Sequence, residues 1–210
     1  AGPAEIARAV EAAEAARREW AALPYHQRAA FLLRAATLLA GPWRDRMNAA
    51  TMLGQAKTCH QAEIDSACEL IDFLRFNVSF AAQIMSEQPT SGPGIWNRLD
   101  HRPLEGFVLA ITPFNFSSIA VNLCTAPALM GNVCLWKPAT TQLLSAWYGF
   151  ELLEEAGFPP GVINFIPGRG AEVGEHTLTH PALAGLHFTG STGTFQHMWR
   201  TIGEHIADYA

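Results

Sequence analysis

Residues 106–138 read GFVLAITPFNFSSIAVNLCTAPALMGNVCLWKP and set out the architecture of the second half of the chain. Two short apolar runs, residues 106–111 and 132–136, lie on either side of a segment that is long enough for one crossover helix. Nearly continuous apolar runs of this length are typical of strands that are covered on both faces. The stretch therefore predicts a strand, a helix and a second strand parallel to the first.

The same alternation continues toward the C-terminus. Apolar runs at residues 162–166 and 184–188 predict two further strands, again separated by segments of helical length. Repeated strand–helix alternation is typical of a Rossmann-like α/β fold with a doubly wound parallel sheet. Ligands of such sheets bind beyond the carboxyl ends of the strands, so the residues that follow each strand are the ones to search for function.

The chain before residue 92 has a helical pattern. A first helix places Ile6, Val10, Ala13 and Trp20 at helical spacing before Pro24 breaks the run, and a second is expected over residues 31–39. A third, over residues 61–84, is expected to turn one apolar face inward, made of Ile64, Ala67, Ile71, Leu74 and Val78. A turn cluster at residues 91–94 follows. We therefore expect a helical segment over residues 1–91 that packs on an α/β domain over residues 92–210.

Composition and charge narrow the function classes. Lys and Arg number 14 and Asp and Glu number 19, so the net charge is −5, and without a basic cluster we expect no nucleic-acid partner. No stretch approaches the roughly 18 uninterrupted apolar residues of a membrane span, so we expect no membrane partner. The chain does not begin with Met and has no signal-peptide pattern, and we expect it to be part of a longer protein.

The cysteines point away from metal binding. None of the four, which are Cys59, Cys68, Cys124 and Cys134, forms a C-x-x-C pair. The spacing argues against both a zinc site and a disulfide framework, so we expect no metal. Reduced thiols in a cytosol-like compartment are the simplest reading of this pattern.

Polar residues follow the first two predicted strands. Asn115 stands at a strand-to-helix junction, where its side chain either caps the helix that begins near Ser117 or donates to a developing oxyanion. Lys137 follows the second strand, and it is either a solvated loop lysine or a ligand of a hydroxyl or phosphate group. Position alone leaves both choices open.

Glycines and hydroxyls follow the other two strands. Gly168, Gly170 and Gly174 form a G-x-G-x-x-x-G pattern, which is one residue longer than the dinucleotide fingerprint and fits either a packing turn or a ligand loop. After the fourth strand, Gly190 and Ser191 open a hydroxyl-rich helix start. Such a start either simply caps the helix or also seats a phosphate at the positive end of the helix dipole.

Several of these segments together resemble one known family. Residues 112–116, 127–132, 136–138, 157–162 and 188–191 resemble, in order and spacing, segments of the NAD(P)-dependent aldehyde dehydrogenases. The resemblance extends over nearly the whole chain. Residues 61–77, 102–107 and 188–197 are similar to the branch of the family that oxidises L-glutamate γ-semialdehyde.

The resemblance implies NAD as the cofactor, with NADP possible. Lys137 would bind the adenosine ribose hydroxyls, Thr112 would line the nicotinamide side, and Gly170 and Gly174 would lie beside the adenine half. Thr140 stands where many relatives carry an acidic residue, which leaves the choice between the two cofactors open. The remaining expected cofactor-binding residues are Pro113, Phe114, Phe188, Gly190, Ser191, Thr192, Gly193 and Thr194.

The resemblance also implies roles at the aldehyde substrate. Asn115 would be the catalytic residue whose amide stabilises the thiohemiacetal oxyanion. Glu69 and Phe116 would lie near the small-molecule aldehyde, and Glu69 shares a helical face with Phe73, Phe76 and Phe80. An ordinary exposed helix carboxylate is the alternative for Glu69. Cys124 and Cys134 do not match the family's nucleophile and are expected to be buried structural residues.

The implied reaction is the NAD-dependent oxidation of L-glutamate γ-semialdehyde to glutamate in proline catabolism. The family's nucleophilic Cys and general-base Glu have no counterpart here, so we expect an incomplete dinucleotide-binding domain without its catalytic domain, inactive alone. The parent protein is expected to be a homo-oligomer of the cytoplasm, or of the mitochondrial matrix in a eukaryote. Two alternatives stay open, namely a non-catalytic dinucleotide-binding or structural module and an enzyme for another semialdehyde, such as succinate semialdehyde.

Overall fold

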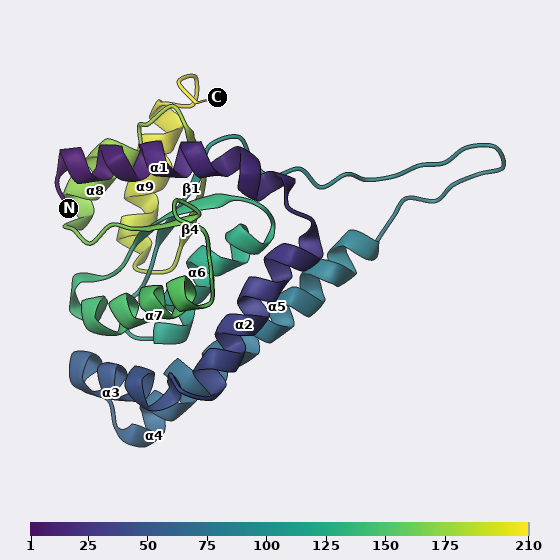
Figure 1. Cartoon of the computed structure of the whole chain (residues 1–210). Helices are drawn as coiled ribbons and strands as arrows, with labels where there is room; N and C mark the ends of the chain where they lie inside the picture. The colour runs from purple at the N-terminus through teal and green to yellow at the C-terminus, as the bar shows by residue number, and fades with distance from the viewer. Residues whose placement is uncertain (210) are drawn as a thin grey trace.

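The computed structural model describes residues 1–209. A helical part comes first and an α/β part follows (Figure 1). The helical part consists of α1 (Pro3–Ala22), α2 (Tyr25–Ala40), α3 (Arg44–Gln55), α4 (Cys59–Ala62), the π-helical turn η1 (Glu63–Cys68) and α5 (Glu69–Ser86).

The α/β part is built on a parallel sheet whose strands lie where the sequence predicts them. Its strands are β1 (Phe107–Ile111), β2 (Val133–Lys137), β3 (Ile163–Phe165) and β4 (Leu183–Phe188). The intervening helices are α6 (Ser117–Leu129), the short 3-10 turn η2 (Thr140–Gln142), α7 (Leu143–Glu155), α8 (Gly170–Thr177) and α9 (Thr192–Glu204). All neighbouring strands are parallel, and their order is β3-β2-β1-β4. The expected doubly wound α/β architecture is confirmed.

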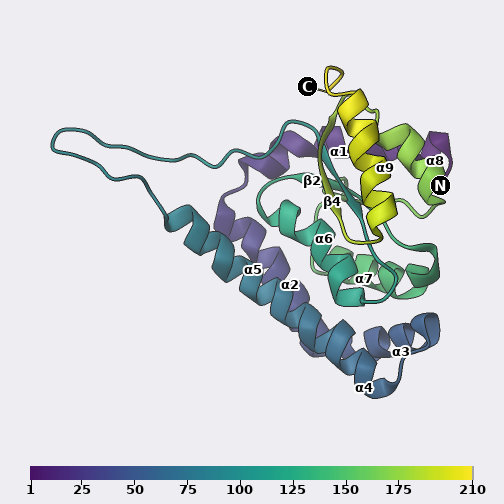
Figure 2. The same cartoon turned by 180° about the vertical axis from the view of Figure 1, so that it is seen from behind.

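Helices cover both faces of this sheet. Helices α6 and α7 lie on one face and α1 and α8 on the other, with α9 beside α8 (Figures 1 and 2). The chain moves outward from β1 to β2 and β3 and then returns to place β4 on the other side of β1. The strand order therefore reverses between β1 and β4, and such a switch point is where open α/β sheets bind ligands.

Helix α1 joins the helical part to the sheet. Its predicted apolar residues, Ile6, Val10, Ala13 and Trp20, are all buried. The indole N–H of Trp20 donates to the carbonyl of Ala128 at 2.8 Å, which ties the end of α1 to the end of α6. Because α1 contacts β2 and β3 directly, it forms part of the layer that covers the sheet.

The third predicted helix is interrupted, and this changes which residues it buries. Ala67, Ile71 and Leu74 are buried as expected, but Ile64 is 52% exposed. The turn η1 has π-helical geometry, which takes up more residues per turn than an α-helix and rotates the positions before it around the axis. The expectation of a continuous apolar face was therefore wrong at Ile64.

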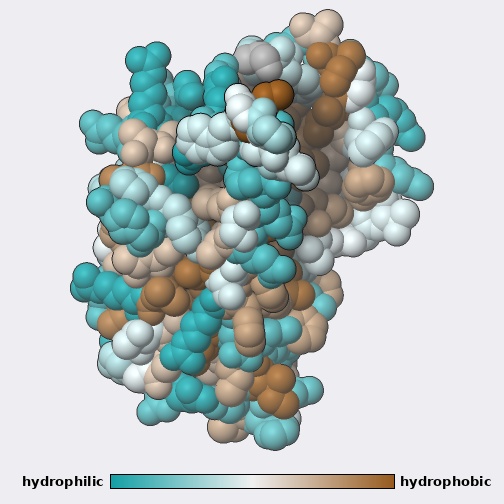
Figure 3. All heavy atoms as spheres, turned by 90° about the vertical axis from the view of Figure 1, so that its right-hand side faces the viewer, coloured by the Kyte–Doolittle hydropathy of each residue, from teal (hydrophilic) through white to brown (hydrophobic). Residues whose placement is uncertain are grey.

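A long extended arm separates the two parts. Residues 87–106 form no helix or strand, and much of this segment projects far from the body of the molecule before it returns to the sheet (Figures 1 and 2). The predicted turn lies near its tip, where the Ile95 N–H donates to the carbonyl of Gly92 at 3.1 Å. Trp96 and Leu99 of the arm are exposed. From the side on which the arm projects, hydrophobic residues lie scattered among hydrophilic ones (Figure 3).

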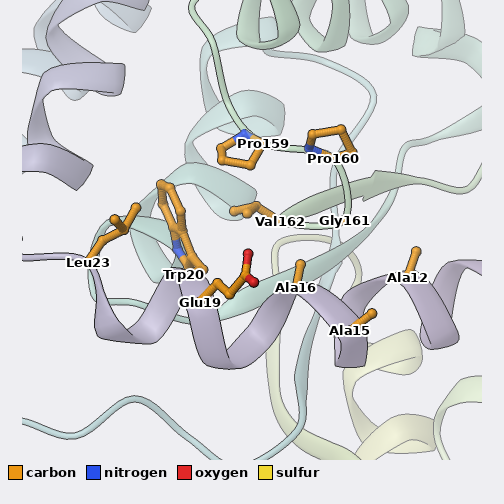
Figure 4. A pocket seen from close by; sticks show the side chains of 10 residues that line it. All are labelled: Ala12, Ala15, Ala16, Glu19, Trp20, Leu23, Pro159, Pro160, Gly161 and Val162. Carbon is orange, nitrogen blue, oxygen red and sulfur yellow. The ribbon is translucent and has the colours of Figure 1, made fainter.

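A shallow hollow of about 580 Å³ lies between α1 and the loop before β3. Small alanine side chains of α1, Trp20 and the carboxylate of Glu19 face Pro159 and Pro160 across it (Figure 4). The hollow lies at the amino end of β3, away from the carboxyl ends of the strands. Its position is therefore not the one at which a parallel sheet binds its ligand. No helix in residues 1–209 has both the length and the apolar character needed to cross a membrane.

Candidate functional site

The register of the sheet brings three strand ends together. Ile111 at the end of β1 stands opposite Lys137 of β2 and Phe188 of β4. Two hydrogen bonds continue this alignment into the loops, because the Thr112 N–H donates to the Lys137 carbonyl at 3.1 Å and the Thr189 N–H donates to the Ile111 carbonyl at 3.3 Å. The loops after β1, β2 and β4 therefore start side by side, and we call this side of the sheet the carboxyl edge.

A cavity of about 870 Å³ opens at the carboxyl edge between α8 and α9. We call it the α8–α9 cavity, and its volume lies in the range of small-molecule and cofactor sites. Its lining brings together predicted cofactor-binding residues from the end of β2 and from the helices α8 and α9, which are Lys137, Gly170, Gly174, Gly193 and Thr194.

Lys137 is the only one of these residues that carries a charge. It is 8% exposed, and no described residue accepts a hydrogen bond from its ammonium group. Burial lowers the pKa of Lys137 below its ordinary value, because the charged form loses hydration. The interpretation of Lys137 as a solvated loop lysine was therefore wrong. A buried ammonium that lines a cavity is suited to donate to hydroxyl or phosphate oxygens of a ligand.

The glycines after β3 lie against this lysine. Helix α8 begins at Gly170, and a Cβ added there would come within 3.9 Å of the Lys137 Nζ atom. Gly174 lies one turn further along the same wall of the cavity. Gly168 lies outside the cavity lining and packs near Val173 instead. The pattern thus divides into one packing glycine and two that border the cavity.

The start of α9 has the helix cap that its sequence suggested. The Ser191 hydroxyl accepts a hydrogen bond from the Thr194 N–H at 3.2 Å, which confirms the helix cap. A second hollow of about 350 Å³ lies at this turn, with a lining made of Phe188, Thr189, Gly190, Ser191, Thr192 and Phe195. The first N–H groups of a helix have no partner within the helix, so the turn presents donors to an anion.

The loop after β1 presents an exposed amide. Thr112 is buried, and its hydroxyl accepts from the Trp136 indole N–H at 3.1 Å, while Pro113 is buried beside it. Phe114 and Asn115 are exposed. The N-cap position of α6 is Phe116, so the interpretation of Asn115 as the cap was wrong. Within residues 1–209 the Asn115 carboxamide makes no hydrogen bond, which leaves its N–H groups available to a ligand.

Glu69 lies at the start of α5, next to the start of α6. It is half-buried and accepts a hydrogen bond from the Ser118 hydroxyl at 2.5 Å. The alternative of an ordinary exposed helix carboxylate was therefore wrong. Of the aromatic residues on its helical face, Phe73 is half-buried, while Phe76 and Phe80 are exposed with ring centroids 5.9 Å apart.

Two charged residues near Phe116 were not foreseen from the sequence. Lys57 forms an ion pair with Asp65, and its Nζ atom lies 4.3 Å from the centre of the Phe116 ring. Burial raises the pKa of Asp65, while the hydrogen bond from Lys57 acts in the opposite direction. Asp65 lies three residues after Ala62 and four before Glu69. This spacing puts the carboxylate of Asp65 on the buried side of the helical segment, and that was the signal in the sequence that could have identified it.

The cysteines have structural positions. Cys124 and Cys134 are fully buried, as expected, and burial raises the pKa of both thiols well above the ordinary value. Cys59 and Cys68 are exposed free thiols. A thiol that is both buried and held protonated is a poor nucleophile, so neither buried cysteine fits that role.

The family model described as "Aldehyde dehydrogenase family" matches residues 1–210. The chain belongs to the aldehyde dehydrogenase family. Among related aldehyde dehydrogenases, the probable delta-1-pyrroline-5-carboxylate dehydrogenase of Schizosaccharomyces pombe is 49% identical over 99% of this chain and 38% of its own length. The mitochondrial delta-1-pyrroline-5-carboxylate dehydrogenase of Mus musculus is 50% identical over 95% of this chain and 35% of its own length.

Solved structures of aldehyde dehydrogenases show the same backbone. The Delta-pyrroline-5-carboxylate dehydrogenase of Mycobacterium tuberculosis bound with NAD is 62% identical, with a TM-score of 0.98 over 100% of this chain and 39% of that chain. The 1-pyrroline-5-carboxylate dehydrogenase from Thermus with bound NAD is 33% identical, with a TM-score of 0.89. The chain thus spans less than two-fifths of the length of these relatives.

Proposed function

We propose that this chain is the NAD-binding portion of an aldehyde dehydrogenase that oxidises L-glutamate γ-semialdehyde, the open-chain form of 1-pyrroline-5-carboxylate, to glutamate. The observation that carries this proposal is the α8–α9 cavity with the buried Lys137 ammonium in its wall, in a chain 62% identical to an NAD-bound relative. In the proposed division of the chain, residues 1–91 form the helical support and residues 92–210 hold the cofactor.

The residues at the carboxyl edge fit a dinucleotide. Lys137 donates to the ribose hydroxyls, because its ammonium has no acceptor among the described residues and lines the cavity. The backbone N–H groups at the start of α9, which follows Gly190 and Ser191 in the sequence, are the donors for the pyrophosphate. Leu178, which directly follows α8, and Met198 of α9 line the cavity and give the adenine ring an apolar slot. NAD, when bound, supplies the acceptor for the hydride that the aldehyde loses.

The loop after β1 supplies this chain's contribution to the chemistry at the aldehyde. The exposed Asn115 carboxamide donates a hydrogen bond to the oxygen that gains negative charge when the aldehyde carbon is attacked. Glu69 and Phe116 border the substrate on the side of α5, where a carboxylate attracts the amino group of an amino-acid aldehyde. The attacking thiolate and the general base are proposed to lie in the part of the protein beyond these residues, because the chain covers less than two-fifths of the length of its relatives. The buried thiols of Cys124 and Cys134 are also unfit for nucleophilic attack.

The wider setting follows from the relatives. Those in Mus musculus and Dictyostelium discoideum are named as mitochondrial enzymes, so we propose a cytoplasmic or mitochondrial-matrix location according to the source. We also propose that the whole protein assembles as a homo-oligomer.

The proposal is tested on the full-length protein that contains this chain. Formation of NADH or NADPH is followed by absorbance with glutamate semialdehyde and with succinate semialdehyde, each with NAD and with NADP. We expect the fastest turnover with glutamate semialdehyde and NAD. Preference for succinate semialdehyde would assign another substrate class.

The 210-residue chain is measured separately. We expect binding of NAD by calorimetry and no turnover with any semialdehyde. Binding of NAD by the chain, combined with an inactive full-length protein, would favour a non-catalytic dinucleotide-binding module. Turnover by the chain alone would overturn the placement of the thiolate and base.

A further inference from the structure

Two unusual backbone features lie close together in the helical part. Ala56, which follows α3, is the only non-glycine residue within the described chain that has a positive φ, at 53°. The turn η1, which follows α4, is π-helical over Glu63–Cys68. Both geometries are unfavourable for ordinary residues and are frequent at functional sites. Both lie in one short region of the chain, at the side chains of Lys57 and Asp65.

The positive φ of Ala56 and the π-helical turn η1 position the two residues of one ion pair. Lys57 directly follows Ala56, and Asp65 lies within η1. The ammonium of Lys57 and the Oδ2 atom of Asp65 form an ion pair whose side chains are 17% and 4% exposed. The second carboxylate oxygen, Oδ1, is buried and has no hydrogen-bond partner among the described residues. The carboxylate thus depends on Lys57 for its stabilisation.

The lysine also contacts the loop after β1. Its Nζ atom lies 4.3 Å from the centre of the Phe116 ring, which is a cation–π distance. Phe116 is half-buried, and its backbone directly follows Asn115. The pair therefore reaches from η1 to the residue next to the proposed oxyanion donor.

The start of α6 is held from two sides. Glu69 accepts from the Ser118 hydroxyl, and on the α3 side the hydroxyl of Ser117 lies 3.0 Å from that of Thr51. These bonds hold the helix itself and do not involve the side chains of Asn115 and Phe116. The Phe116 ring is instead contacted by the Lys57 ammonium.

We propose that Lys57 is a positioning residue, which holds the Phe116 ring and, through the adjoining backbone, the carboxamide of Asn115. Asp65 fixes the ammonium of this lysine in place. The inference rests on the proposed function, because it assigns Lys57 a part in aligning the aldehyde end of that site. Lys57 itself touches neither substrate nor cofactor in this account.

The test uses Lys57→Met in the full-length protein. We expect kcat with glutamate semialdehyde to fall about 10- to 100-fold, since a small displacement of an aligned group costs this much. The Kd for NAD is expected to stay unchanged, because the α8–α9 cavity lies elsewhere on the carboxyl edge. Lys57→Arg keeps a cation that stacks on an aromatic ring, and it is expected to restore most of the turnover.

Two further variants separate positioning from general damage. Lys57→Met combined with Asp65→Asn removes both charges and leaves no unpaired buried carboxylate, and it should lose as much turnover as Lys57→Met alone. The matched control is Arg44→Met, which breaks the other ion pair formed with η1, that to Glu63. This control is expected to leave kcat unchanged because the Arg44–Glu63 pair does not contact Phe116.

A double-mutant cycle with Asn115→Ala gives the decisive result. If Lys57 acts through Asn115, Lys57→Met adds little to the loss that Asn115→Ala already causes. Fully additive losses, or normal turnover in Lys57→Met, would overturn the positioning role. Normal turnover in Asn115→Ala itself would instead overturn the proposed function of the site, so the two failures are distinguishable.

Discussion

The backbone N–H of Thr112 donates to the carbonyl of Lys137 at 3.1 Å, and the Trp136 indole N–H donates to the Thr112 hydroxyl at the same distance. These bonds join the loop that carries Asn115 to the strand that carries Lys137, the proposed ligand of the ribose. Because both groups stand on one hydrogen-bonded frame, a dinucleotide held by Lys137 would be aligned with Asn115, as the proposed function requires.

Replacing Asn115 should separate these two activities. In the full-length protein, we expect Asn115→Ala to lower kcat about 10²- to 10³-fold, which is the usual cost of removing one oxyanion donor. The Kd for NAD should stay close to that of the unchanged protein, because Asn115 is not in the lining of the α8–α9 cavity. Steady-state kinetics and calorimetry measure the two quantities. Near-normal turnover would remove Asn115 from the mechanism.

Replacing Lys137 should mainly weaken NAD binding, in contrast to the replacement of Asn115. Loss of a charged hydrogen-bond donor costs about 1.5–3 kcal/mol, so we expect Lys137→Met to weaken NAD binding by about one to two orders of magnitude. Phe165→Leu, at the end of the neighbouring strand β3 and outside the cavity lining, serves as the matched control and should bind NAD normally. Unchanged affinity in Lys137→Met would contradict the ribose role.

The same substitution should change the pH dependence of stability. Burial lowers the pKa of Lys137 in the folded chain below the ordinary value of 10.5. Between these two pKa values the unfolded chain binds more protons than the folded one, so stability gains from this group as the pH rises through that window. Below this pH window the charged form of Lys137 is buried, and its lost hydration lowers the free energy of unfolding. Lys137→Met should therefore raise Tm most at neutral pH, and the difference should shrink toward pH 10.5 in thermal scans of the chain.

The cap of α9 should contribute measurable stability. Because the Ser191 hydroxyl accepts from the Thr194 N–H, we expect Ser191→Ala to lower the free energy of unfolding by about 0.5–2 kcal/mol. Ser191→Gly should cost only a few tenths, since glycine suits the cap backbone. Urea unfolding of the chain measures both variants. Equal losses in the two would show that the hydroxyl has no capping role in solution.

The glycine that precedes β1 should tolerate no side chain. Gly106 has a φ of +118°, and a Cβ there would lie 2.1 Å from the Ala182 carbonyl oxygen. We expect Gly106→Ala to destabilise the chain by at least about 1–3 kcal/mol, the cost of the backbone strain alone. Gly203→Ala is the matched control, because a Cβ there meets nothing within 4 Å and a helical alanine is favoured by about 0.5–1 kcal/mol. A stable Gly106→Ala variant in the same unfolding assay would show that this backbone relaxes.

The sheet could be predicted from the sequence because its signal is local. Each strand is a short apolar run, and the glycine, proline and polar residues around it mark the ends. Lys137 and Ser191 could be placed at the carboxyl edge for the same reason, since a parallel sheet puts all such ends on one side. The strand order was not predictable in this way, because it depends on contacts between distant segments.

The helical part shows where local patterns are insufficient. Helix α3 is mostly polar and buries only Met47, Ala50 and Thr51, so it has little periodicity to detect. The outward rotation of Ile64 results from a π-helical turn, which no spacing rule anticipates. The contact between Lys57 and Phe116 joins residues far apart in the chain, so it becomes visible only once the fold brings α6 against η1.

The position of α1 has a consequence for the synthesis of the protein. Helix α1 ends at Ala22, but the strands and the Pro159 loop on which it rests are made much later. At roughly 5–20 residues per second, the ribosome needs about 7 to 30 s to reach them. During that time the indole of Trp20 lacks its acceptor at Ala128, and the apolar face of α1 is available to chaperones. Helix α1 thus reaches its native contacts only after most of the sheet has been synthesised.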